Sequence, residues 1–392
     1  MAHDREHDIV VYGATGFTGR LVAEYLVRQY GGRAERPRWA MAGRSRDKLE
    51  QVRDLIGAPA DTPLLTADAD EPASLLRLAQ SAKVVLTTVG PYQLYGSDLV
   101  AACAEAGTDY ADLCGEPGWM REMIDAHEAA AKASDARITF SCGFDSIPFD
   151  LGVLELQRHA AERFGGPAPR VKGRVRNMQG GFSGGTAASL KATLAAVAKR
   201  PELAKLLVSP FALTPGFTGP DQPKGLLPHH DEAVGAWVAP FIMAPINTKN
   251  VHRTNFLLGH RYGADFRYDE MIVTGLGDLG RAAAEAMAKA NPLGGDKGPK
   301  PGEGPSREER ENGFYDLLFV GEFADGRTIR YAVKGDRDPG YGSTSKMIAE
   351  TAIALTETTE RRGGVWTPGA LLGQALTRRL EANAGLMFGL ER

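Results

Sequence analysis

Three glycines near the N-terminus have the spacing of a turn that cradles phosphate. Gly13, Gly16 and Gly19 form a GxxGxxG pattern that follows the β-branched run 9–12 and opens a helical pattern over 18–30. Glycines here allow a tight turn, close approach of the backbone to a pyrophosphate and packing of the helix on the strand, and the helix N-terminus adds unpaired N–H groups. The spacing departs from the usual GxGxxG, and the alternative is a purely structural turn. We predict a dinucleotide site formed by Gly13, Ala14, Thr15, Gly16, Phe17 and Thr18.

The residues after the second predicted strand distinguish NADP from NAD. A site for NAD usually places an acidic residue there, whereas a 2′-phosphate needs a cation. Here the predicted strand is followed by Gly43, Arg44 and Ser45, and the first acidic residue after the strand is Asp47. We expect Arg44 to hold the 2′-phosphate, Ser45 to donate a hydrogen bond and Lys48 to assist, although a solvated basic helix start would read the same way. Asp68, after the third strand, either meets the adenine amino group or caps the next helix.

Several side chains follow the later strands, at the sheet edge where α/β proteins bind ligands. Hydride transfer needs orientation, exclusion of water and often one proton donor. Our candidates for catalysis are Tyr92, Glu116 and Asp145; their alternatives are core packing, a helix cap or ion pair, and a hinge turn. Four residues after the fourth strand should contact the ribose and nicotinamide: Val89, Gly90, Pro91 and Tyr92.

Substrate contacts are predicted in the second half of the chain. Ser146 borders the crossover between domains, and the run 183–186, with Gly185 and Thr186, offers N–H groups before an Ala-rich helix. An ordinary helix N-cap is the alternative for that run, and it explains the residues slightly better. Arg253 is suited to a carboxylate or a carrier phosphate, with a surface salt bridge as the alternative.

The apolar segment 234–246 is too short and too broken by proline to span a bilayer. It is either core, a wall for an acyl chain, or a patch that rests on a membrane. Few cations besides Lys249 and Arg253 lie nearby, whereas an amino-acid adduct would need several for its carboxylates. We therefore favour a small, apolar, acyl or lipid-like substrate.

The elements that must position these residues alternate regularly in the first 148 residues. Short apolar strands and helices follow one another from 9 to 142, a pattern typical of a Rossmann-type, doubly wound parallel sheet. We assign 1–148 to this NADP-binding domain. Strands are expected at 9–12, 38–42, 64–67, 84–89, 108–113 and 137–142.

The remaining chain predicts a second, mixed α/β domain over 149–338 with a largely antiparallel sheet. Its expected strands are 171–178, 251–258 and a hairpin of 314–323 with 327–333, and its helices include 151–163 and 281–290. Residues 291–312, rich in Gly, Pro and charge, should form a loop. The tail, 339–392, is expected to be mostly helical, without a strand to pair, and to pack back on the first domain.

Composition excludes several classes of protein. The chain has 392 residues, a formal charge of −3 and three cysteines without CxxC spacing. These values argue against a nucleic-acid partner, a zinc site and a disulfide framework. His229 and His230 have no second ligand pair, so no metal is expected. The charged N-terminus leads directly into a strand, which is unlike a signal peptide. We expect a cytoplasmic protein, peripheral to a membrane if it contacts one, with a homodimer as one option.

Taken in order, these stretches resemble the saccharopine dehydrogenase-like oxidoreductases, and within them the bacterial trans-acting enoyl reductases. The resemblance implies a Rossmann domain, a central substrate domain, C-terminal helices that return to the first domain, and NADP(H) as cofactor. It rests on GATGFTG (13–19), AGR (42–44), VGPYQLYG (89–96), TDYADLCGE (108–116), GFDSIPFDLG (143–152), GGT (184–186) and GYGSTSKMIAE (340–350).

The substrate does not follow from the family, whose members reduce both carbon–carbon double bonds and imines. Our leading hypothesis is an NADP(H)-dependent enoyl reductase that acts on a lipid or polyketide-derived intermediate. The alternatives are a saccharopine-type reductase of amino-acid adducts and a non-catalytic NADP-binding protein attached to lipid surfaces.

Overall fold

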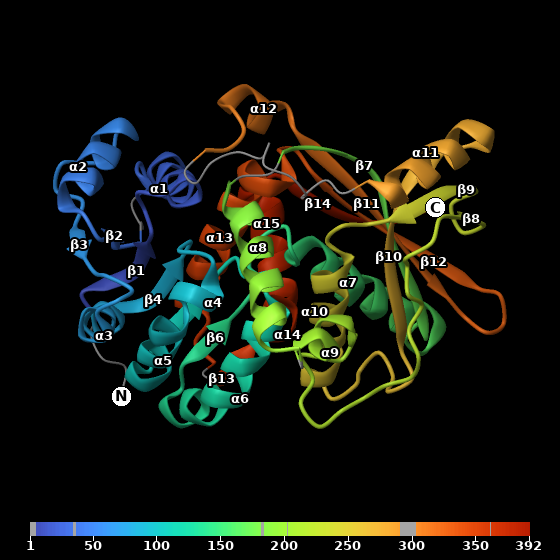
Figure 1. The fold of residues 1–392 in the computed structure, drawn as a ribbon, viewed down its shortest axis with the longest axis horizontal. Coiled ribbons are helices and arrows are strands. Elements are labelled where there is room, and N and C mark those ends of the chain that lie inside the picture. The colour runs from blue at the N-terminus through green and yellow to red at the C-terminus, as the bar shows by residue number, and fades with distance from the viewer. Residues whose placement is uncertain (1–4, 34–36, 182–183, 202, 291–302, 361) are drawn as a thin grey trace.

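The computed structural model describes residues 5–33, 37–181, 184–201, 203–290, 303–360 and 362–392. In these residues, two seven-stranded sheets lie side by side with helices packed between them (Figure 1). One sheet is wholly parallel and the other mostly antiparallel, which confirms the predicted α/β class.

The first sheet has the strand order β13-β6-β5-β4-β1-β2-β3. In its central strand, Ile9 and Val11 join the core that contains helix α1, whereas Val10 and Tyr12 join the core that contains α3, α5 and α6. Because helices cover both faces, residues 9–12 of this strand are buried without the alternation of polar and apolar residues that a half-exposed strand shows. The strands are β1 (His7–Tyr12), β2 (Trp39–Gly43), β3 (Leu64–Thr66), β4 (Ala82–Thr87), β5 (Asp109–Ala111), β6 (Arg137–Thr139) and β13 (Gly364–Trp366); the helices are α1 (Phe17–Tyr30), α2 (Arg46–Leu55), α3 (Pro72–Ser81), α4 (Tyr92–Tyr95), α5 (Ser97–Ala106) and α6 (Pro117–Ser134).

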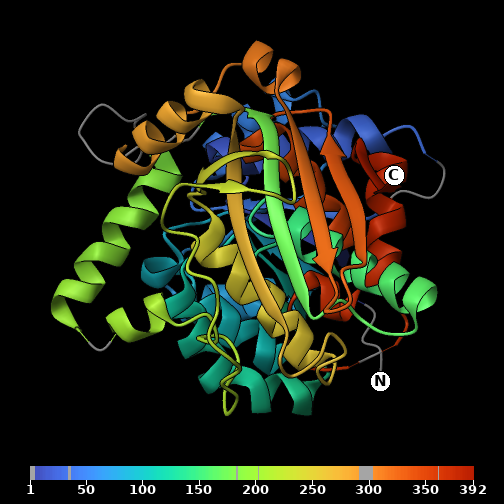
Figure 2. The ribbon, with the colours of Figure 1, turned by 90° about the vertical axis from the view of Figure 1, so that its right-hand side faces the viewer.

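The second sheet has the order β14-β12-β11-β7-β10-β9-β8 and faces the viewer in Figure 2. Strands β7 and β10 run parallel, and the other neighbours in the described sheet are antiparallel. Helices α7 and α10 cover its inner face. The elements are α7 (Ile147–Phe164), β7 (Arg170–Gln179), β8 (His229–Asp231), β9 (Ala236–Pro240), α10 (Ala244–Leu257), β10 (Arg267–Gly275), α11 (Gly277–Lys289), α12 (Arg307–Asn312), β11 (Phe314–Glu322), β12 (Thr328–Gly335) and β14 (Leu386–Glu391).

The C-terminal segment ties the two sheets together. Helix α13 (Thr344–Glu357) packs on α1 and on strands β1, β4 and β5, and α15 (Gly373–Asn383), which follows the short α14 (Pro368–Leu371), packs on α13 and α7. The buried carboxylate of Glu350 accepts hydrogen bonds from the hydroxyls of Tyr25 and Tyr30 and pairs with Arg379. The expectation of a tail without strands was wrong, because β13 extends the first sheet beside β6 and β14 extends the second beside β12. The three-part division of the chain itself stays a prediction.

Two further expectations about elements were wrong. Residues 251–258 lie mainly in helix α10, whose first turn contains Pro245; the β-branched Val251 and Thr254 suggested a strand, but helix packing overrides that preference. Part of the expected loop 291–312 is helix α12, which has a capping box between Ser306 and Glu309. Residues 291–302 lie outside the described part of the chain.

Candidate active site

The glycine turn between β1 and α1 has the geometry of an anion site. Gly13 has a φ of +88°, which favours glycine, and a Cβ on Gly19 would stand 2.1 Å from the carbonyl oxygen of Gly13. Gly16 is the N-cap of α1, so no capping side chain covers the helix end, and the first turn contains no acidic residue. The turn therefore leaves the first N–H groups of α1 open to a phosphate.

The residues predicted for the adenosine end gather at the carboxyl ends of β1, β2 and β3. Arg44 is exposed directly after β2, and Asp68 is half-buried after β3. Both act on the buried Tyr12, whose hydroxyl has its pKa raised to about 12. Burial is the largest cause, Asp68 also raises the pKa and Arg44 lowers it. Arg44 and Asp68 thus flank one place at the sheet edge, and a guanidinium there suits a 2′-phosphate.

Two neighbours of Arg44 have local roles as well. The hydroxyl of Ser45 caps α2 by accepting a hydrogen bond from the backbone N–H of Lys48 at 3.4 Å, while the side chain of Lys48 is exposed. Asp68 accepts a hydrogen bond from the N–H of Asp70 at 3.2 Å, and the N-cap of the next helix is Glu71. The helix-cap alternative for Asp68 is therefore not what the structure has.

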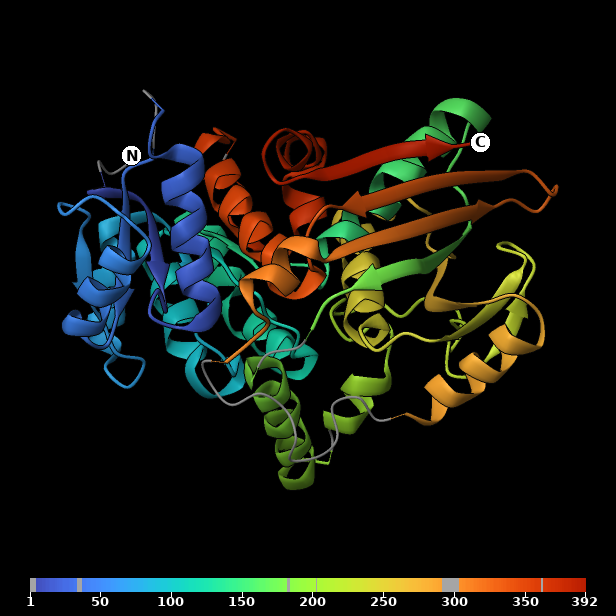
Figure 3. The ribbon, with the colours of Figure 1, turned by 90° about the horizontal axis from the view of Figure 1, so that it is seen from above.

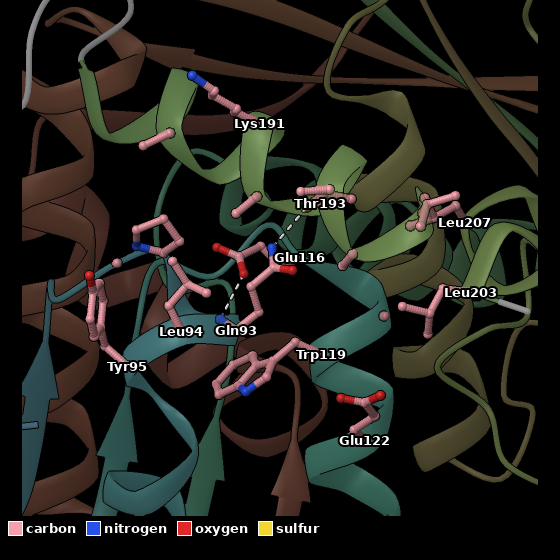
Figure 4. Close-up of a pocket in the computed structure, with 18 of the residues that line it drawn as sticks. Gln93, Leu94, Tyr95, Glu116, Trp119, Glu122, Lys191, Thr193, Leu203 and Leu207 are labelled. Atoms are coloured by element: carbon pink, nitrogen blue, oxygen red, sulfur yellow. Dashed lines mark hydrogen bonds between the residues drawn. The ribbon is translucent and has the colours of Figure 1, made fainter. Parts of the chain in front are cut away.

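A pocket of about 940 Å³ begins at the glycine turn and extends between α4, α6 and two helices of the second half of the chain, α8 (Gly184–Lys199) and α9 (Leu203–Val208) (Figure 4). Beyond the turn, its wall is mostly apolar, with Trp119 beneath and Leu203 and Leu207 at one side. Of the residues predicted from sequence, the pocket brings together Gly16, Phe17, Thr18, Gly90, Pro91 and Glu116.

Glu116 holds the start of α4 in place. Its two carboxylate oxygens accept hydrogen bonds from the backbone N–H groups of Tyr92 (3.0 Å) and Gln93 (2.8 Å). This bidentate contact fixes the loop that contains Gly90 and Pro91. Glu116 is 3% exposed and lines the pocket, so it combines a helix-capping role with a place in the site.

Tyr92 lies behind the pocket rather than in it. Its hydroxyl donates to the carbonyl of Thr87 at 3.3 Å and accepts from the N–H of Leu113 at 3.1 Å, and its ring packs against Trp119. Burial raises its pKa well above the usual value for tyrosine. The structure thus gives Tyr92 the packing position, and Val89 packs against the same core.

Asp145 and Ser146 follow β6 at the same edge of the first sheet. Asp145 is half-buried, and burial raises the pKa of its carboxyl to about 7; one of its oxygens is buried without a partner among the described residues. Ser146 is buried, and its hydroxyl accepts a hydrogen bond from the side-chain amide of Asn250 at 2.8 Å. Neither residue lines the pocket.

The predicted substrate residues are more dispersed. Arg253 is 2% exposed, and its guanidinium donates to the backbone carbonyls of Leu213 and Val365, which leaves it far from the role of a surface salt bridge and outside the main pocket. Gly185 and Thr186 lie in the first turn of α8, and residue 183 lies outside the described residues.

The segment 234–246 does not supply the apolar wall. It forms β9 and the start of α10, and Val238, Ala239 and Phe241 belong to the buried core. Of the three alternatives for this segment, the structure has the core, because pairing with β10 places β9 in the sheet interior. The wall instead comes from α8, where Ala188, Ala192 and Ala195 recur at helical spacing on the face toward the pocket; that period was the signal in the sequence that we missed.

The described residues contain neither a candidate metal cluster nor a membrane-spanning helix. No group of three or more His, Cys, Asp or Glu side chains in them is placed to hold a metal ion. None of their helices has the length and apolar character that crossing a bilayer requires. Cys114 and Cys142 are buried with pKa values raised well above that of a free thiol, as expected for packing residues.

Comparison with known proteins agrees with this geometry. Residues 9–140 match the family described as the saccharopine dehydrogenase NADP binding domain. A protein of Mycobacterium tuberculosis (strain H37Rv), provisionally named a trans-acting enoyl reductase, is 43% identical over 412 residues, with 97% of each chain covered. The trans-acting enoyl reductase of Mycobacterium bovis BCG is 38% identical over 421 residues, with 99% of each chain covered.

The fold has a solved counterpart. Apo saccharopine dehydrogenase (L-Glu forming) from Saccharomyces cerevisiae superposes with a TM-score of 0.56 at 9% identity, covering 98% of this chain and 99% of that one, which speaks for the fold alone. Together with the glycine turn and the full-length relatives, these matches make the chain a member of the saccharopine dehydrogenase-like oxidoreductases, an enzyme family that binds NADP.

Proposed function

We propose that this protein reduces a carbon–carbon double bond in an apolar acyl substrate, with NADPH as the hydride donor. The observation that carries the proposal is the pocket that runs without interruption from the glycine turn to an apolar wall formed by α6, α8 and α9. NADPH, when bound, supplies a hydride; the protein must orient it, exclude water and hold one proton. The names of the mycobacterial relatives support the same reaction.

The charges along the pocket favour this substrate over an amino-acid adduct. An adduct with several carboxylates needs cations beside the nicotinamide, yet the charged group next to the Gly90–Pro91 loop is the carboxylate of Glu116. The cations of the lining, Lys191, Lys199 and Arg200, are exposed on the outer part of α8 and just after it. An inner wall that is apolar and acidic suits an acyl chain and repels a dicarboxylate.

We propose Asp145 as the group that holds the proton for the second carbon. It lies at the carboxyl edge of the parallel sheet, where such folds place ligands, and one of its oxygens is buried without a partner among the described residues, although it is not in the lining of the main pocket. Burial raises its pKa to about 7, which favours the protonated carboxyl near neutral pH. Tyr92 and Glu116 are less suited, because their oxygens already contact backbone groups.

The test is direct. Purified protein is mixed with NADPH deuterated at the transferable position and with 2-enoyl thioesters of coenzyme A of increasing chain length. We expect NADPH oxidation to rise with chain length and the deuterium to appear at the β-carbon of a saturated product, as measured by mass spectrometry. A parallel reaction with lysine and 2-oxoglutarate should remain at background. Turnover of the amino-acid mixture, with none of the enoyl series, would assign the protein to imine reduction instead.

A further inference from the structure

Three helices on one side of the molecule carry exposed apolar side chains and an excess of exposed cations. They are α8, α9 and α11, which lie along the same edge of the molecule in Figure 3 and on the same side in Figure 2. We call their exposed surface the α8–α9–α11 face. It carries five exposed aliphatic side chains: Leu194 (62% exposed), Val208 (80%), Leu276 (71%), Leu279 (87%) and Met287 (42%).

The charge on this face is mainly positive. The described parts of the three helices, together with Arg200 just after α8, have six exposed cationic side chains. Their exposed acidic side chains are two, Asp278 and Glu285. Glu285 pairs with Arg281 at 2.9 Å, and Arg200 pairs with Glu122 of α6 at 2.6 Å. The six cations are Lys191, Lys199, Arg200, Lys205, Arg281 and Lys289.

We propose that the α8–α9–α11 face docks on an anionic lipid surface. Exposed aliphatic side chains on helices that also carry lysine and arginine are the features of elements that lie in a bilayer interface. There the aliphatic groups enter the acyl region and the cations meet anionic headgroups. The five exposed side chains are spread over three separate helices, and none of them lines the main pocket, so a broad surface suits them better than a single peptide.

A second copy of the chain fits this face less well. In a two-fold dimer the same patch would meet itself and bring like charges together, which is costly without matching acids. An anionic surface has the complementary charge and accepts aliphatic side chains as well. The positive charge and the exposed aliphatic side chains together therefore favour an anionic lipid surface as the binding partner of this face.

The α8–α9–α11 face also lies next to the main pocket. Lys191, Lys199 and Arg200 lie both on this face and at the rim of the 940 Å³ pocket, while Leu203 and Leu207 line the interior behind them. An acyl chain leaving the bilayer beside α8 would therefore meet the apolar wall first and the Gly90–Pro91 loop last. This route rests on the proposed function, whereas docking itself does not, and the two can fail separately.

The test is co-sedimentation of the full chain, without substrate, with vesicles of phosphatidylcholine alone or with about one third phosphatidylglycerol. We expect binding to the anionic vesicles only, weakened by salt because exposed charges are screened. The double variant Leu194→Ser/Leu279→Ser should lose most of the binding, and Lys191→Gln/Lys205→Gln should weaken it about five-fold per lysine. The matched control is Met387→Ser, a 61% exposed residue on β14 at the opposite edge of the molecule, which should bind as the parent does.

Three outcomes would overturn the proposal. The first is equal sedimentation of parent and Leu194→Ser/Leu279→Ser variant. The second is loss of binding on lysine removal with no effect of the leucine exchange, which would assign the face to a soluble acidic partner. The third is a concentration-dependent dimer in analytical ultracentrifugation that the leucine variant dissolves. NADPH oxidation with a short, soluble enoyl thioester is followed in all variants, so that loss of docking and loss of the proposed reaction are told apart.

Discussion

The two sides of the main pocket are built in different ways. On the side of the first sheet, the position of the backbone forms the site. A Cβ on Gly19 would lie 2.1 Å from the carbonyl oxygen of Gly13, and Glu116 accepts hydrogen bonds from two backbone N–H groups. On the side of α8, the pocket is lined by half-exposed side chains. One hydrogen bond, from the side-chain amide of Gln93 on α4 to the hydroxyl of Thr193, connects α8 to the first side. Cofactor binding should therefore be intolerant of small changes, whereas substrate binding should change gradually with the composition of the wall.

The largest effect is expected at Gly19. In Gly19→Ala the new methyl group overlaps the carbonyl group of Gly13, so either the turn or α1 must move. Losing one or two charge-assisted hydrogen bonds to the pyrophosphate costs on the order of 100-fold in affinity. We expect NADPH affinity, measured by calorimetry, to fall at least that far. Gly32→Ala is the control, because a Cβ there meets no atom within 4 Å. Unchanged affinity in Gly19→Ala would mean that the turn is not the phosphate site.

The next effect concerns Asp145 and depends on pH. If its carboxyl supplies the proton, Asp145→Asn should lower kcat about 100-fold at pH 6 and remove the decline of the parent above pH 7. Exchange of the exposed Asp278 on α11 for Asn should leave the profile unchanged. A parent rate that is flat across pH 7, with an active Asp145→Asn variant, would exclude this donor.

The same substitution makes an independent prediction for stability. The folded pKa of Asp145, about 7, is above its ordinary value near 3.8, so the unfolded chain loses this proton first as the pH rises. The parent therefore loses stability between about pH 4 and pH 7, and the loss persists at higher pH. In urea unfolding, the difference in stability between Asp145→Asn and the parent should shift in favour of the variant over that interval and then level off.

The cofactor preference should depend on Arg44. Removing a charge-assisted contact to the 2′-phosphate costs roughly 1.5–3 kcal/mol, so Arg44→Ala should lower the preference for NADPH over NADH about 10- to 100-fold. NADH affinity should hardly change. Arg46→Ala is the control, because the Arg46 guanidinium already pairs with Glu50 at 3.1 Å and donates to the carbonyl of Leu64 at 3.3 Å. An equal loss for both dinucleotides would place the 2′-phosphate elsewhere.

The contrast between the two sides also decides what the sequence could predict. Dinucleotide binding requires particular residue types at fixed positions, such as Gly13 after a strand and Arg44 without an acid beside it. The sequence therefore predicted the parallel sheet and the NADP cofactor, whereas the individual cofactor contacts stay a prediction. An apolar wall requires only small or aliphatic residues at helical spacing. The segment 234–246 met that description better than α8 did, yet the sheet buries it, because composition alone does not say which apolar run pairs with a strand.

Buried polar residues misled the prediction in a similar way. Arg253 was expected to bind substrate, but its guanidinium joins backbone carbonyls from two distant segments, Leu213 and Val365. The residues around it, which include Thr254 and Asn255, are buried on helix α10, although the sequence predicted a strand there. Long-range contacts of this kind leave no local pattern, and neither do β13 and β14, which are short strands added at sheet edges far along the chain.

The smallest effect is expected at Thr193, and it measures how independent the wall is from the cofactor side. Thr193→Val keeps the shape of the side chain but removes the hydroxyl that accepts the 3.1 Å hydrogen bond from the Gln93 amide. Because a partly exposed hydrogen bond contributes about 1 kcal/mol or less, KM for a long enoyl thioester should change less than five-fold, and NADPH affinity should stay the same. Thr193→Ser, which keeps the hydroxyl, is the control in steady-state kinetics. A parallel loss of NADPH affinity in Thr193→Val would contradict the comparison, since α8 would then position the Gly90–Pro91 loop through α4 and belong to the cofactor site.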